Sequence, residues 1–167
     1  NPNGMEDILK VYFHKQVPNV SVNDKATLVD ILSCILYNTK NFRYGPIPAP
    51  EAQSKVRQVI RGYISDQRPI PILVPWGSIK ADFSPSLDIA ELSAISTLVG
   101  LNNQIKRYYE PGLDIAIRIE DLSGFRLFSM EPMLPQIIAN SKAYSQDLVK
   151  LINIMGDDFI TPRLESL

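Results

Sequence analysis

The feature that most constrains the fold of this sequence is a pair of short apolar runs separated by one long helical pattern. The runs are Ile70–Val74, bounded by prolines, and Leu113–Ile119, which follows a Pro-Gly turn. Between them, apolar residues recur at helical spacing from Ile89 to Tyr108. Two strands joined by a helix of this length form a right-handed crossover in a parallel sheet. The pattern therefore predicts a strand-helix-strand unit.

The long helical segment carries its own start and stop signals. Asp88 and Glu91 have the spacing of a capping box, and Pro111-Gly112 ends the pattern. Gly100 lies in the middle and lowers helix stability by about 1 kcal/mol relative to alanine. A kink or a close packing contact is expected there.

Other segments complete the predicted layout. Asp158–Ile160 is expected to begin a further strand, and Phe125–Phe128 to form a short edge strand. Further helical patterns occur at Met5–Lys15, from a cap at Asn23 or Asp24 through Leu36, at Glu51–Ser65, and from near Ser141 to Met155. The resulting prediction is an α/β fold, a three-layer Rossmann-like domain with a mostly parallel sheet flanked by helices.

The composition bounds the class of protein. Apolar residues make up 45% of 167 residues, which suits one domain with a sizeable core; residues 1–4 precede the first methionine and receive no structural weight. The chain has a net charge of -1 and therefore lacks the excess of basic residues that nucleic-acid-binding proteins carry, so nucleic acid is a disfavoured partner. No apolar run approaches the roughly 20 residues of a membrane span. No signal-peptide pattern opens the chain, and a cytoplasmic location is expected.

Missing motifs narrow the chemistry. The sequence has neither the phosphate loop of nucleotide-binding proteins nor a G-x-G-x-x-G fingerprint. His14 and Cys34 are single residues of their type, so no metal site and no cofactor are expected. Cys34 lies within a helical apolar pattern and is predicted to be a buried small hydrophobe in a reducing compartment.

The best candidate site follows the first predicted strand. Ligands in open α/β sheets bind beyond the carboxyl ends of strands. Here the strand runs into Trp76, Ser78 and Lys80. Lys80 could bind a phosphate or carboxylate, or form a Schiff base if desolvated, and Trp76 could stack on an aromatic substrate. The alternatives are an exposed lysine on a turn and a packed tryptophan.

Two carboxylates follow the second predicted strand. Glu120 and Asp121 would lie at the same edge of the sheet as Lys80 if the strands are parallel. They could supply acid-base chemistry or receive an amino group. The alternative is a polar strand end with a turn-forming aspartate.

Three motifs in order across residues 28–160 resemble a known family. The matching residues are Pro75 and Lys80 in the first motif, Leu87, Asp88 and Glu91 in the second, and Tyr109, Pro111 and Gly112 in the third. This order resembles the isonitrile (isocyanide) synthases, the pyoverdine and dityrosine biosynthesis protein family. Two departures stand out: Asp82 replaces an asparagine, and the S-D-G of the family becomes Glu-Asp-Leu-Ser-Gly from Glu120.

The resemblance implies a Rossmann-like fold and a biosynthetic transferase. It implies that the amino group of an aromatic amino acid condenses with a phosphosugar ketone. Lys80 would meet the phosphate or carbonyl, Glu120 and Asp121 the amine, and Trp76 and Ser78 would contact the substrate. Family members are longer, so the chain is expected to be a fragment, a reduced relative or a homologue with another role.

Two other functions stay open from the sequence. A non-catalytic binding or assembly domain would keep the fold and bind a protein partner or a second copy of the chain. A transferase acting on nucleotides or nucleic acid is suggested only by Lys55, Arg57, Arg61 and Arg68, with steep salt dependence of binding as its signature.

Overall fold

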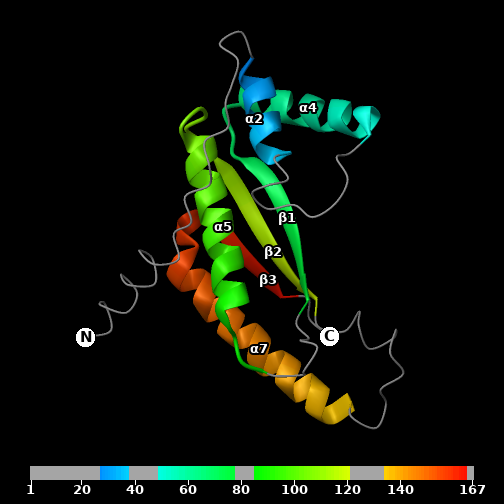
Figure 1. Cartoon of the computed structure of the whole chain (residues 1–167), viewed down its shortest axis with the longest axis vertical. Coiled ribbons are helices and arrows are strands. Elements are labelled where there is room, and N and C mark those ends of the chain that lie inside the picture. The colour runs from blue at the N-terminus through cyan, green and yellow to red at the C-terminus, as the bar shows by residue number, and fades with distance from the viewer. Residues whose placement is uncertain (1–26, 38–48, 78–84, 121–133, 165–167) are drawn as a thin grey trace, which may run out of the picture.

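The structure of the protein is a computed structural model that describes residues 27–37, 49–77, 85–120 and 134–164 (Figure 1). The elements in chain order are α2 (Leu28–Leu36), α4 (Pro50–Ser65), β1 (Ile70–Gly77), α5 (Ile89–Lys106), β2 (Leu113–Glu120), α7 (Leu134–Met155), the 3-10 helix η2 (Asp157–Phe159) and β3 (Ile160–Leu164). The predictions for residues 5–15 and 125–128 lie outside the described residues.

The described strands form a parallel sheet in the order β1-β2-β3. Ile70 is opposite Leu113 at one end of the β1-β2 pair, and Gly77 is opposite Glu120 at the other. α5 connects β1 to β2, and α7 lies between β2 and β3 along the chain. The α/β class and the parallel sheet flanked by helices confirm the prediction and are consistent with a small Rossmann-like domain.

Helices α5 and α7 lie together along the sheet (Figure 1). The side chains of β2 that pack into the hydrophobic core are Leu113, Ile115, Ile117 and Ile119, and they alternate with Asp114, Ala116 and Arg118 on the other face. On β1, the residues on that other face are Pro71, Leu73 and Pro75, and all three are exposed in the described structure. This second face of the sheet therefore presents an apolar strip along β1.

One hydrophobic core joins the helices and the sheet. Leu32 and Ile35 of α2 and Ile60 of α4 are buried in the same cluster as the strand residues. Tyr109 connects α4, the start of β1 and the end of α5, because its single hydroxyl proton is shared between two backbone oxygens, those of Tyr63 at 3.0 Å and Arg68 at 2.8 Å.

Helix α5 begins at the predicted capping box. The backbone N–H of Asp88 donates to Glu91 Oε2 at 2.7 Å, and that of Ala90 donates to Asp88 Oδ1 at 2.7 Å. The helix runs unbroken through Gly100, which is buried. The helix is thus not interrupted at this glycine.

Three element boundaries differ from the predictions. α2 begins after a Thr27 cap, not at residue 23 or 24. β1 continues past Pro75 to Gly77, although the apolar run ends at Val74. α7 begins at Leu134, several residues before Ser141, with Pro135 in its first turn, where a proline costs no helical hydrogen bond.

The prediction that Cys34 is buried is wrong, because its side chain is exposed on α2. Its neighbours Ser33 and Ile35 are buried, so the helix turns the cysteine away from the core. Among the described helices, none is both long and apolar enough to cross a membrane.

Candidate functional site

The carboxyl edge of the sheet is where β1 and β2 end together. Gly77 is the last residue of β1 and pairs in register with Glu120, the last residue of β2. The prediction that the two strand ends meet at one edge is therefore confirmed. Ser78, Lys80 and Asp121 lie outside the described residues, and Glu120 is described only by its backbone.

Trp76 is the predicted site residue whose side chain is described. Its indole Nε1 donates a hydrogen bond to the Tyr144 hydroxyl of α7 at 2.9 Å. The side chain is half-buried and packs against the hydrophobic core. The indole edge is thus held by α7, so Trp76 fixes the end of β1 while its side chain stays partly exposed.

The hydrogen bond of Trp76 continues into a buried carboxylate. Tyr144 is 2% exposed, and its hydroxyl donates to Glu91 Oε1 at 3.0 Å. Glu91 is 7% exposed, and its other oxygen accepts from the Asp88 backbone at the start of α5. We call Trp76, Tyr144 and Glu91 the edge triad. It links the end of β1, the first turn of α5 and the middle of α7.

Burial raises the pKa of the Tyr144 phenol above its ordinary range. The bond from Trp76 acts in the opposite direction, and the neighbouring Glu91 carboxylate adds to the rise. Tyr144 therefore remains a protonated donor to Glu91 throughout the neutral pH range.

The first turn of α5 is occupied by the chain's own carboxylates. Helix N-termini attract anions because their N–H groups and dipole favour negative charge. Here Asp88 and Glu91 supply that charge in the capping box. The charge that this helix end attracts is therefore supplied from within the helix's own first turn.

The sequence identified two members of the edge triad, each for another reason. Trp76 was predicted to stack, and Glu91 was predicted as a capping residue. Tyr144 follows the helical spacing of α7, which marks it as core-facing without indicating its hydroxyl partners. Within the described ranges, no group of three or more His, Cys, Asp or Glu side chains is arranged to hold a metal ion.

Comparisons with protein-family models, with curated proteins and with solved structures find no match to this chain. Its functional interpretation therefore depends on the residues and their geometry.

Proposed function

We propose that the carboxyl edge of the sheet is the active site of an isonitrile-synthase-like enzyme in the cytoplasm. In this proposal the amino group of an aromatic amino acid condenses with a phosphosugar ketone. The observation that carries the proposal is the parallel register that places Gly77 opposite Glu120. The segment leading to Lys80 and the acidic segment Glu120–Asp121 thereby leave the sheet from neighbouring strand ends.

The proposed roles follow from the chemistry of imine formation. The amine nitrogen bonds to the ketone carbon, and water leaves after proton transfer to the carbonyl oxygen. Glu120 and Asp121 would bind the ammonium group and accept its proton, while Lys80 would hold the phosphate or polarise the carbonyl. Ser78 would contact the substrate, and Trp76 would stack on its aromatic ring from a position fixed by Tyr144.

The proposal is tested by incubating the protein with tyrosine or tryptophan and ribulose 5-phosphate. The isonitrile product is expected by mass spectrometry. Lys80→Ala should abolish it, whereas Lys150→Ala, which removes an exposed lysine of α7, should not. Product formation that is equal in the two variants would contradict the role of Lys80.

A second candidate is a non-catalytic binding or assembly domain. The specific observation in its favour is the apolar strip on β1, where Leu73 is 58% exposed between Pro71 and Pro75. Exposed apolar strips mark interaction surfaces when they are contiguous. This function predicts a protein partner or a homo-oligomer, and Leu73→Lys should then shift the gel-filtration profile toward smaller species. Isonitrile formation by a monomer would exclude it.

A further inference from the structure

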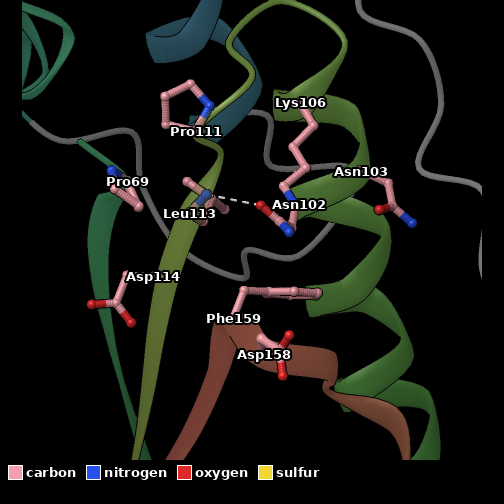
Figure 2. Close-up of a pocket in the computed structure, with 9 residues that line it drawn as sticks. All are labelled: Pro69, Asn102, Asn103, Lys106, Pro111, Leu113, Asp114, Asp158 and Phe159. Atoms are coloured by element: carbon pink, nitrogen blue, oxygen red, sulfur yellow. Dashed lines mark hydrogen bonds between the residues drawn. The ribbon is translucent and has the colours of Figure 1, made fainter. Parts of the chain in front are cut away.

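The second face of the sheet, which carries the apolar strip, is not covered by any described helix. Leu73 is 58% exposed there, and Pro71 and Pro75 on either side of it are also exposed. Figure 2 shows Asp114, near the start of β2, pointing away from α5 and toward this face. Parallel sheets are almost always covered by helices on both faces. The described elements therefore supply two of the three layers that such a sheet requires.

The side chains of the second face divide into two charged ends and an apolar middle. Arg118 of β2 is directly opposite Arg163 of β3, and both lie within two residues of the carboxyl ends of their strands. Asp114 lies near the amino end of β2. Between these ends, Leu73 is opposite the small residue Ala116. A helix that complements this face has an acidic end, a basic end and an apolar stripe between them.

The second face is too small for a stable interface between two chains. Three strands of five to eight residues, spaced about 4.8 Å apart, form a face of roughly 300 Å². A standard interface buries about 800 Å² on each partner, so a second copy on this face alone would bind weakly. A segment of the same chain needs less area, because its tether gives it an effective concentration in the millimolar range. The size of the face therefore favours an occupant from within the chain.

Residues 5–15, which lie outside the described residues, have the sequence that this occupant requires. Their apolar positions at helical spacing are Met5, Ile8, Leu9 and Tyr12. Glu6 and Asp7 are at the start of the pattern, and Lys15 is at its end. A helix of this length extends about 16 Å, close to the roughly 13 Å of strand from residue 71 to residue 75.

We propose that residues 5–15 form a helix that docks on the second face, antiparallel to the strands. This direction brings Glu6 and Asp7 to the arginine pair and Lys15 to Asp114. The helix then ends at the amino-terminal edge of the sheet, where α2 lies (Figure 1). Residues 16–26 lead from there to the Thr27 cap of α2 and can span up to about 36 Å.

The docked helix determines what can bind to the apolar strip. It covers Leu73, so a protein partner or a second copy of the chain has to displace it before reaching the strand. The inference does not depend on isonitrile formation, because the second face is distinct from the carboxyl edge at which the active site is proposed.

Paramagnetic relaxation in NMR spectra of the full chain tests the docking. A spin label is attached at Lys10→Cys, on the polar side of the proposed helix, after Cys34→Ser removes the exposed thiol of α2. The amide signals of Leu73 and Ala116 should broaden, whereas that of Lys150, on the exposed surface of α7, should not. A mixture of spin-labelled chains without ¹⁵N and ¹⁵N-labelled chains without the spin label should show no broadening.

Matched variants locate the contact on both partners. Leu9→Gln should lower the ratio of docked to undocked segment by about tenfold, the factor expected for losing one buried leucine side chain, whereas His14→Gln on the polar side should not. On the sheet, Leu73→Gln should reduce the broadening at Ala116, and Val59→Gln, at an exposed valine of α4, is its control. Both sheet-side positions are exposed, so these variants should remain folded.

Three results would overturn the inference. Broadening that occurs only in the mixed sample would assign the second face to a second copy of the chain. Broadening at Val56 and Val59 instead of Leu73 would place the segment on the exposed valines of α4. No broadening at any of these residues would show that residues 5–15 leave the second face uncovered.

Discussion

At the scale of single residues, the Tyr144 hydroxyl is the centre of the edge triad because it accepts from Trp76 and donates to Glu91. Tyr144→Phe would remove the acceptor of the Trp76 indole N–H and a donor to the buried Glu91 carboxylate. We expect a loss of about 1.5–3 kcal/mol in unfolding free energy, since one bond involves a charged group. Urea denaturation measures it. Tyr108→Phe, at a tyrosine that is 42% exposed, is the control, and equal losses would contradict the central role of Tyr144.

The same residue predicts a pH dependence. Burial raises the folded-state pKa of Tyr144, and also that of Tyr109, whereas the unfolded-state value is about 10. The stabilisation is complete below about pH 10 and is lost as pH rises toward the folded pKa, because the unfolded chain releases these protons first. Tyr144, whose pKa is raised the more strongly of the two, should contribute about 1.4 kcal/mol per pH unit in this window. Tyr144→Phe should make the alkaline fall in urea stability shallower, and an unchanged slope would refute this.

Two glycines predict opposite effects of the same substitution. A Cβ on Gly156 would lie 2.7 Å from the backbone oxygen of Ile152 and 2.8 Å from Ile160 Cβ, so Gly156→Ala should destabilise by about 1–3 kcal/mol. Gly62 lies within α4 with no atom within 4 Å of such a Cβ. Gly62→Ala should therefore stabilise by about 0.5–1 kcal/mol. Thermal unfolding measures the stability of both variants. Changes in melting temperature of the same sign would contradict the close packing at Gly156.

At the scale of elements, local sequence patterns were sufficient to predict a helix or strand where a capping motif or a sustained apolar periodicity was present. The Asp88 capping box and the alternation in Leu113–Ile119 identified α5 and β2. The extension of β1 through Pro75 was missed because a proline ordinarily ends a strand. The spacing of apolar residues also could not predict which helix faces pack together. Tyr144 and Glu91 are 53 positions apart, and only the packing of α7 against α5 brings them into contact.

The direction of the β1 backbone explains why its prolines are tolerated. The Ile70 N–H donates to Gly112 O at 3.0 Å, so in a parallel ladder the even-numbered residues bond β2 and the odd-numbered ones face outward. Pro71 and Pro75 therefore lack N–H groups only on the outer side, where β1 has no partner among the described strands. Prolines at such positions blunt an edge against added strands.

This arrangement predicts the effect of restoring the outward donors. The double variant Pro71→Val with Pro75→Val should self-associate through β1, and light scattering should show larger species at rising concentration. Leu73→Val is the control, because it adds a β-branched residue to the same strand without adding an N–H group. Equal association of the two variants would show that strand propensity, not the missing donors, governs this edge.

At the scale of the whole molecule, one contiguous core joins parts that are distant in the sequence. Ile60 of α4 and Leu148 of α7 are both almost fully buried in the cluster that contains the β2 side chains. A single core of this kind favours one cooperative unfolding transition. Loss of the packing at Ile60 or at Leu148 exposes core surface on which both α4 and α7 depend. The circular-dichroism signal averages over all helical residues of the chain, whereas the fluorescence of Trp76 reports the carboxyl edge of the sheet.

The two signals should therefore change together in urea. Ile60→Ala and Leu148→Ala should each lower the midpoint, by about 2–5 kcal/mol in unfolding free energy, while circular dichroism and Trp76 fluorescence remain coincident. Val59→Ala, at a residue of α4 that is 53% exposed, should change the midpoint little. If Ile60→Ala shifted the helical signal but not the fluorescence, α4 would be unfolding independently of the sheet. The edge triad would then be supported by α5 and α7 alone, rather than by the core as a unit.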